Sequence, residues 1–365
     1  MNTCLSDLDD LSKYEVIRLA FNHKLKYKSK LGLSKKIKFG VEIEALGTDF
    51  IRKIRDNKNI YYFEGYPSSK PKDIYGKDRW ILYSDDSLYD EDSFDVRPPR
   101  CEIEDLWYEK KITTEEYKDM LHNYYNGGEV ASPILKDNFE DWNKIKKMLK
   151  YMKKTIPDLR INESCSTHNH FDIEIFDNNP ELLYNFIILL AENENVLTRF
   201  YSGEYINIRS ITDEWANPIK PLIRYGLDFN IDKSSYRALI KSIYFGNPTM
   251  KEYSFDFWEI YNGYYKHLSN TFENRLPNGT LSKEIIQNNV MLMGFLMEYA
   301  SSGMYDVERG IYNLKSDNNC DILGPFYVAD MLPNDDLKLD FLSQYYKDGR
   351  VTKSKQLVKS KRIFY

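Results

Sequence analysis

The sequence contains few cysteines and histidines, and it lacks the segments that mark secreted or membrane-spanning proteins. Only four Cys occur among the 365 residues, and no two of them form a Cys-x-x-Cys pair. The sequence therefore indicates neither a zinc knot nor a disulfide framework. No apolar run approaches the about 20 residues needed to cross a bilayer, and the polar N-terminus does not resemble a secretory signal peptide. We therefore expect a cytoplasmic protein with no membrane partner.

Two further absences narrow the function. The sequence has no Gly-x-x-x-x-Gly-Lys-Ser/Thr motif, which argues against a P-loop nucleotide site. The formal net charge is only −5, and the basic residues of segment 350–365 are more typical of a solvated tail than of a nucleic-acid site. Hydrophobic residues make up 42% and charged residues 29% of the chain, which is typical of a globular protein with a buried core.

Periodicity predicts a chain with both helices and strands. Apolar residues recur at helical spacing in several segments, and we expect helices over 7–30, 113–124, 138–156, 180–201, 232–245, 283–301 and 336–347. Apolar and polar residues alternate in shorter segments, and we expect strands over 39–44, 80–84, 129–133, 168–176 and 271–276.

The strand expected over 39–44 carries two carboxylates on one face. Glu42 and Glu44 are two residues apart, so their side chains point to the same side of the strand. Adjacent carboxylates repel, and a divalent cation with hard oxygen ligands would cancel that repulsion. A strand with a solvated polar face would show the same pattern, so the pair alone does not decide between the two interpretations.

Two later strands repeat this spacing with complementary chemistry. His168 and His170 share a face, and the alternation places Asp172 and Glu174 on the same side. Paired imidazoles beside acids favour a metal or phosphate role. Glu273 and Arg275 also share a face, which fits either an exposed ion pair or a phosphate site.

Other polar residues stand at the ends of expected strands. Glu129 follows Gly127-Gly128, and Asp85-Asp86-Ser87 follows the strand over 80–84. Asp pairs at strand ends commonly form turns, so this segment is either a turn or part of a site.

Five motifs in this order resemble the amidoligase family. They are Phe39-Gly40-Val41-Glu42-Ile43-Glu44, Trp80 to Leu88, Gly128-Glu129-Val130-Ala131-Ser132-Pro133, Cys165-Ser166-Thr167-His168-Asn169-His170-Phe171-Asp172, and Thr271 to Thr280. This family is similar to the glutamine synthetase and glutamate–cysteine ligase superfamily of carboxylate–amine ligases. The resemblance covers roughly residues 36–300.

The resemblance implies an ATP- and Mg²⁺- or Mn²⁺-dependent ligase that forms an amide through an acyl phosphate. Its implied substrates are a carboxylate and an amine, and a peptide or protein is one candidate. The implied metal ligands are Glu42, Glu44, Glu129, His168 and Glu273. His170 would lie near the ATP phosphates, and Arg275 would stabilise the γ-phosphoryl group. Glu129 and Asp85 would have catalytic roles, Ser87 would line the nucleotide or substrate side, and Arg199 or Arg209 could bind a substrate carboxylate.

The implied fold is α+β: a curved, mostly antiparallel sheet with a concave active-site face and helices packed outside. We expect an N-terminal helical segment over 1–35, a catalytic domain over 36–300 with an insertion at about 88–123, and a C-terminal helical extension over 301–349. The sequence departs from the family at Asn274, which takes a usually apolar position between Glu273 and Arg275. A phosphotransferase on a guanidino acceptor and a catalytically silent binding module are the competing functions.

Overall fold

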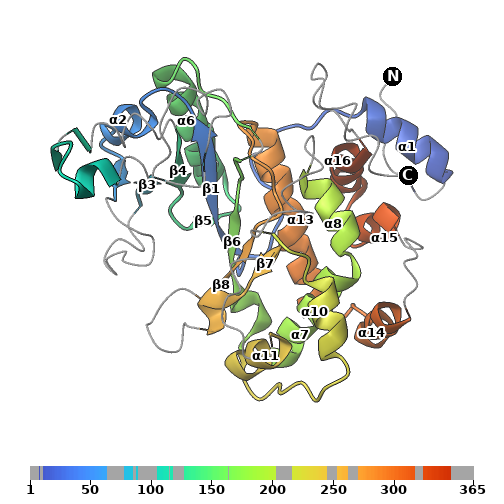
Figure 1. The fold of residues 1–365 in the computed structure, drawn as a ribbon. Helices are drawn as coiled ribbons and strands as arrows, with labels where there is room; N and C mark the ends of the chain where they lie inside the picture. The colour runs from blue at the N-terminus through green and yellow to red at the C-terminus, as the bar shows by residue number, and fades with distance from the viewer. Residues whose placement is uncertain are drawn as a thin grey trace.

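The fold consists of one mostly antiparallel sheet with helices packed on it, as the α+β prediction requires (Figure 1). This computed structural model describes residues 8, 11–63, 78–84, 88, 105–114, 116–117, 127–162, 164–202, 216–244, 253–261, 270–316 and 324–346. Asp85, Ser87, Arg209 and the segment 350–365 lie outside the described residues.

Within the described residues the sheet has eight strands. Seven of them lie in the order β2-β3-β4-β1-β6-β8-β7, and β5 pairs with one end of β1. All neighbouring pairs are antiparallel except β2 and β3, which run parallel. The strands are β1 (Lys38–Leu46), β2 (Ile60–Tyr62), β3 (Trp80–Tyr83), β4 (Gly127–Ala131), β5 (Leu135–Lys136), β6 (Asn169–Asp172), β7 (Phe255–Asp256) and β8 (Thr271–Asn274).

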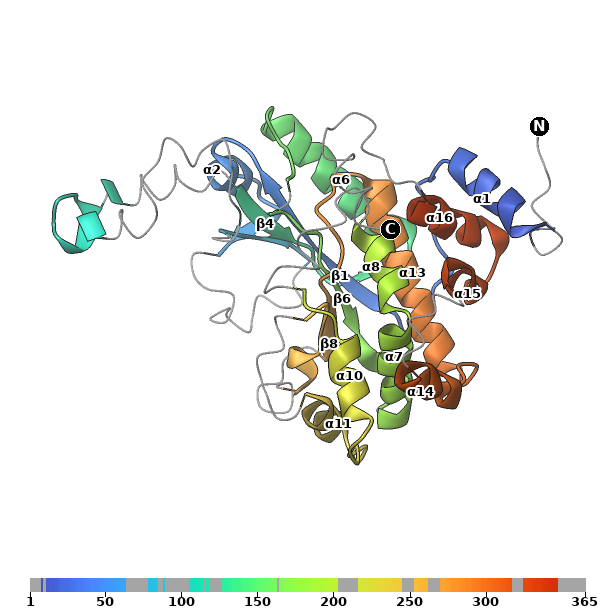
Figure 2. The same ribbon diagram turned by 45° about the vertical axis from the view of Figure 1, so that its right-hand side comes forward.

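Helices lie along one side of this sheet, with α13 beside β6 in both views (Figures 1 and 2). The helices are α1 (Lys13–Asn22), α2 (Phe50–Arg55), α6 (Phe139–Thr155), α7 (Pro180–Glu192), α8 (Glu194–Ser202), α10 (Lys220–Gly226), α11 (Tyr236–Ile243), α13 (Lys283–Ser301), α14 (Val307–Lys315), α15 (Gly324–Asp330) and α16 (Asp335–Tyr346). None of the described helices is both long enough and apolar enough to cross a membrane.

The alternation in β1 divides the sheet into a packed face and a polar face. Phe39, Val41 and Ile43 are buried in the main core. The Phe39 ring lies 4.9 Å from the Trp142 ring of α6, centroid to centroid. Burial of such side chains stabilises the fold by about 1.5–3 kcal/mol each. Because side chains alternate along a strand, the carboxylates of β1 project from the opposite face.

Helices α6 and α13 begin where the sequence predicts, each directly after a capping residue. Asn138 accepts a hydrogen bond from the backbone of α6, and Ser282 accepts one from the backbone of α13. These caps satisfy backbone N–H groups that have no partner within the helix. Helix α16 also matches its prediction.

Four sequence expectations need correction. The helix expected over 7–30 is only α1, because the chain is extended after His23. The helix expected over 180–201 is two helices, α7 and α8, separated at Asn193. The helix expected over 232–245 begins only after Ser235, whose side chain caps α11. Strand β6 ends at Asp172, whose side chain accepts a hydrogen bond from Glu174 N and starts a short 3₁₀ turn.

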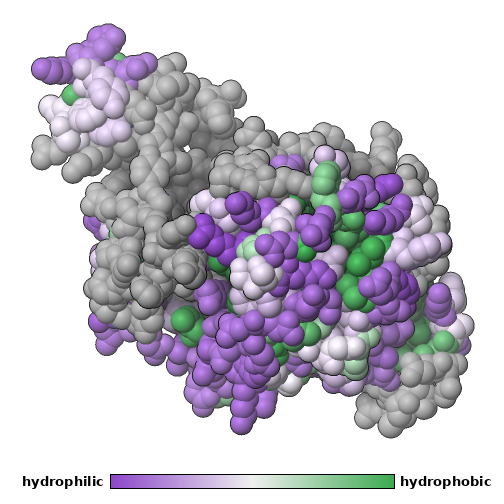
Figure 3. Space-filling view, turned by 90° about the horizontal axis from the view of Figure 1, so that it is seen from below, coloured by the Kyte–Doolittle hydropathy of each residue, from purple (hydrophilic) through white to green (hydrophobic). Residues whose placement is uncertain are grey.

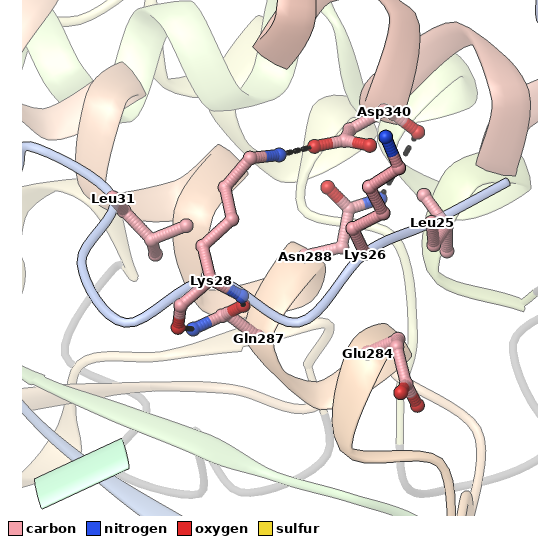
Figure 4. Close-up of a pocket in the computed structure, with 8 residues that line it drawn as sticks. All are labelled: Leu25, Lys26, Lys28, Leu31, Glu284, Gln287, Asn288 and Asp340. Atoms are coloured by element: carbon pink, nitrogen blue, oxygen red, sulfur yellow. Dashed lines mark hydrogen bonds and ion pairs between the residues drawn. The ribbon is translucent and has the colours of Figure 1, made fainter. Parts of the chain in front are cut away.

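Segment 23–34 has no regular secondary structure. We call it the N-terminal arm, and side chains from three helical regions hold it. The Asp137 carboxylate, just before α6, accepts hydrogen bonds from three consecutive arm amides, those of Leu31, Gly32 and Leu33, at 2.7–2.9 Å. Gln287 of α13 exchanges two hydrogen bonds with the Lys28 backbone, and the Lys28 ammonium pairs with Asp340 of α16 (Figure 4). The arm is therefore an integral part of the fold.

The underside of the molecule is mostly hydrophilic where it is coloured, with scattered hydrophobic patches (Figure 3). The large exposed apolar side chains of the described residues include Tyr225 and Phe229, whose rings lie 5.2 Å apart. A small exposed apolar contact of this kind is normal on protein surfaces.

Candidate metal centre

Three strands contribute one ligand each to a compact group of side chains. Glu42 of β1, His170 of β6 and Glu273 of β8 offer ligand atoms that all lie within 4.8 Å of one another. His170 is directly opposite Glu273 across β6 and β8, and its Nε2 is 3.1 Å from Glu42 Oε2. Two carboxylates and an imidazole are a donor set that suits Mg²⁺ or Mn²⁺, so this group fits a divalent cation.

His168 lies beneath this group and is buried. Its Nδ1 is 2.9 Å from Glu273 Oε1, 3.7 Å from Glu42 Oε2 and 3.9 Å from Glu44 Oε1. Burial and the Arg275 charge lower the pKa of His168, but Glu273 and Glu42 outweigh them, so the net pKa is raised. The neighbouring carboxylates thus stabilise the charged form of His168 more than burial and Arg275 destabilise it.

Arg275 forms an ion pair with the same carboxylate. Arg275 Nη1 lies 2.7 Å from Glu273 Oε1, and the two side chains are only 12% and 13% exposed. Burial favours the neutral form of Glu273, yet Arg275 and His168 outweigh burial and hold the Glu273 pKa far below its ordinary value. Glu273 is therefore ionised, and the guanidinium of Arg275 has the planar shape that suits carboxylate or phosphate oxygens.

Glu44 and Glu129 extend the row of carboxylates toward β4. They are directly opposite each other on β1 and β4, so both project to the polar face of the sheet. Glu44 is buried and accepts a hydrogen bond from Ser166 N at 2.6 Å, while Glu129 is half-buried. Together with Glu42 and Glu273, they form a row of four carboxylates from β1, β4 and β8 on the polar face.

The structure brings together most of the residues singled out in the sequence. The residues on the polar face are Glu42, Glu44, Glu129, His168, His170, Glu273 and Arg275. Arg199 instead lies on α8, where its Nε bonds to Tyr345 O at 3.3 Å and its guanidinium stacks on the Tyr345 ring. Glu174 has left the strand and pairs with Lys38, and Asp172 also lies near Lys38.

Two residues near the centre were missed by sequence reasoning. The Ser166 hydroxyl lies 2.7 Å from His168 Nε2, and Asp256 of β7 is buried directly opposite Glu273. Ser166 has the same two-residue spacing as His168 and His170, so that spacing could have identified it. Asp256 contributes to the raised pKa of Arg275, but its short strand gives no alternating pattern.

The chain segment after β8 packs closely against the segment before β6, next to the metal centre. Gly279 donates its N–H to Cys165 O at 2.9 Å, and a Cβ at Gly279 would lie 2.7 Å from Cys165 Cβ. Glycine is therefore required where the chain after β8 passes the chain before β6. This contact fixes the segment that leads into His168.

Comparison with known proteins agrees with the resemblance read from the motifs. The chain is similar to a solved structure described as a bifunctional glutathione synthetase from Pasteurella multocida, with 11% identity and a TM-score of 0.39. That alignment covers 86% of this chain and 47% of the other, so this chain spans about half its length. No curated protein matches the chain. The family described as "Putative amidoligase enzyme" matches residues 35–297, well over half of the sequence, and the chain therefore belongs to the amidoligase family.

Proposed function

We propose that this protein is an ATP- and divalent-metal-dependent carboxylate–amine ligase that forms an amide bond through an acyl phosphate. The observation that carries the proposal is the group formed by Glu42, His170 and Glu273, with Arg275 paired to Glu273 at 2.7 Å. Cation ligands and a phosphate-binding arginine on one sheet face are the usual components of phosphoryl transfer. Membership of the amidoligase family supports the choice of a carboxylate as the phosphoryl acceptor.

The proposed roles follow from these positions. Glu42, His170 and Glu273 hold a divalent cation, and Glu44 and Glu129 provide further oxygen ligands on the same face. The cation, when bound, neutralises phosphate oxygens during transfer. The buried His168 positions the Glu273 carboxylate for the cation, since its Nδ1 lies 2.9 Å from Glu273 Oε1.

The chemistry has two steps. A substrate carboxylate oxygen attacks the γ-phosphorus of ATP, the bond to the bridging oxygen breaks, and ADP leaves. Arg275 stabilises the charge on the γ-phosphoryl group during this step. An amine then attacks the acyl carbon and phosphate leaves, while the amine proton passes to a general base. Glu129 is our candidate for this base, because it is half-buried at the edge of the carboxylate row.

The insertion at about 88–123 supports the class of substrate that we propose. Its described residues form a small aromatic unit in which Trp107 stacks on Tyr117 with centroids 4.8 Å apart, and Tyr108 is exposed. Segment 105–117 stands away from the sheet (Figure 2). A unit of this kind suits contact with a large substrate, so we propose a peptide or protein as one of the two substrates.

Product analysis tests the proposed function. Purified protein with ATP and Mg²⁺ is screened against pools of acids and amines for substrate-dependent ADP release, and the products are identified by mass spectrometry. We expect ADP, phosphate and an amide, with activity lost in Arg275→Ala and kept in Arg199→Ala, whose side chain packs on α16. ADP with a phosphorylated guanidino product would assign a phosphotransferase instead, and no turnover in the wild type would favour a binding module.

A further inference from the structure

The antiparallel pairing of β6 and β8 contains one extra residue next to the metal centre. Asn169 is opposite Asn274, whereas Ser166 is opposite Asn278. Three residue steps from Asn169 back to Ser166 therefore match four residue steps from Asn274 to Asn278. One extra residue in one of two paired strands defines a β-bulge. The extra residue falls in the stretch that holds Arg275 and Leu276.

The bulge removes a backbone partner from Leu276. In an uninterrupted ladder Leu276 would lie opposite Thr167, but Thr167 N donates to Pro277 O at 3.1 Å. The Asn274 side chain takes over, because its Oδ1 accepts a hydrogen bond from Leu276 N at 3.3 Å. This bond to the amide two residues ahead is the local pattern for which Asn side chains are suited.

This bond explains why a polar residue occupies a position on the packed face. Asn274 is fully buried, and an apolar side chain there would leave the Leu276 amide without its acceptor. Its neighbours are also polar: Asn169 is directly opposite, and the Tyr201 hydroxyl is close enough for the Asn274 amide to lower the Tyr201 pKa, although burial keeps that pKa raised. Tyr201 in turn donates to Asn289 O of α13 at 3.2 Å.

The bulge matters because of the residue it contains. Arg275 follows Asn274 directly, its own N–H donates to Ser254 O of the β7 segment at 3.0 Å, and its side chain reaches Glu273. Bulges commonly redirect a side chain beside a functional site. We propose that Asn274 is a positioning residue that holds this bulge and thereby directs Arg275 toward Glu273 and His168. The importance of Arg275 itself rests on the proposed function.

Hydrogen exchange tests the bulge without requiring activity. The chain offers a matched control, because Asn169 is equally buried and faces Asn274, yet its side chain donates to His168 O and not to the bulge. We expect Asn274→Leu to speed exchange of the Leu276 amide about tenfold, the effect of losing one typical hydrogen bond. Asn169→Leu should leave that amide near its wild-type rate when both variants are compared at equal global stability. Equal exchange in the two variants would overturn the proposal.

A second variant covers the case in which Asn274→Leu does not fold. Asn274→Thr keeps a side-chain oxygen that can accept from the amide two residues ahead, and Thr is a good strand former. We expect Asn274→Thr to restore protection of the Leu276 amide and a wild-type affinity for Mg-ATP, while Asn274→Leu weakens that affinity about tenfold. An unprotected Leu276 amide in Asn274→Thr, or unchanged affinity in a folded Asn274→Leu, would overturn the assignment. A wild type that binds no Mg-ATP would refute the proposed function, whereas the exchange comparison judges the bulge separately.

Discussion

Glu44 and Glu129 lie directly opposite one another on the antiparallel strands β1 and β4. Like charges in this position destabilise a sheet by up to about 1 kcal/mol, and a cation shared between them would reverse the effect. Without divalent ions, we expect Glu129→Gln to raise the free energy of unfolding by about 0.5 kcal/mol. With Mn²⁺ present, the same variant should gain less stability from the metal than the wild type does. Urea unfolding with and without Mn²⁺ checks both, and equal gains from Mn²⁺ would contradict a role for Glu129 at the cation.

Removing the charge of Glu273 should affect stability as well as metal binding. Glu273 and Arg275 are 13% and 12% exposed, so Glu273→Gln removes the carboxylate that pairs with a nearly buried guanidinium. Breaking one side of such a pair costs about 3 kcal/mol, which chemical denaturation can measure. Glu174→Gln is the control, because the Glu174 side chain is 51% exposed in its pair with Lys38 and solvent screening makes the loss of such a pair small. Similar losses in both variants would argue against a special role for the buried pair.

Metal binding should be visible as thermal stabilisation. A cation that binds only the folded state raises the melting temperature by mass action. We expect Mn²⁺ to raise the melting temperature of the wild type, and His170→Ala to reduce that rise, because His170 belongs to the three-ligand group. His23→Ala is the matched control, since His23 instead pairs with Asp340 of α16. Equal Mn²⁺ responses in the two variants would place the cation elsewhere.

A buried carboxyl away from the centre should make stability depend on pH. Glu194 is buried at the start of α8 and accepts hydrogen bonds from the amides of Ile219 and Lys220 and from the Ser254 hydroxyl. Burial is the largest influence and raises the Glu194 pKa above its ordinary 4.5, although these hydrogen bonds oppose the shift. The folded state therefore binds the proton more tightly than the unfolded state.

The sign of the effect follows from that difference. The stabilising contribution of protonated Glu194 is complete below the unfolded pKa and is lost as pH rises through the folded pKa. The wild type should therefore lose stability relative to Glu194→Gln as pH increases upward from about 4.5. Urea unfolding of both proteins over a pH series measures this. A wild type whose stability relative to Glu194→Gln stays constant or rises with pH would contradict the prediction.

Local sequence could predict the elements whose periodicity and capping agree. Strand β1 alternates from Lys38 to Ile43, and α13 begins directly after the Ser282 cap. The break at Asn193 could not be read, because apolar spacing continues across it; in the structure its side chain bonds to Leu189 O at the end of α7. The early end of β6 was missed because Asp172 bonds to the local backbone, which outweighs the alternation that follows.

The site could be predicted only in part. The two-residue spacings identified Glu42, His168 and Arg275 as candidates. The prediction that they lie together in one site came from the family resemblance. Strand β1 pairs with β6 across more than a hundred residues of sequence, and no local pattern encodes that pairing. The bulge beside Arg275 was equally hidden, since it exists only in the pairing of two strands. Asn274 was noticeable in the sequence as a polar residue at a usually apolar position. Its hydrogen bond with the Leu276 amide is visible only in the structure.

The arm that precedes β1 has a practical consequence for anyone preparing this protein. The family match begins at residue 35, directly after the arm ends. The amide of Ser34, the last residue of the arm, donates a hydrogen bond to Glu298 of α13. A fragment trimmed to the family boundary would therefore lose the chain that satisfies Asp137, Gln287 and Asp340. In the trimmed protein these buried side chains would lack the hydrogen-bond partners that the arm supplies. Poor folding or inactivity of such a fragment would therefore result from the missing arm and would not test the proposed catalytic residues.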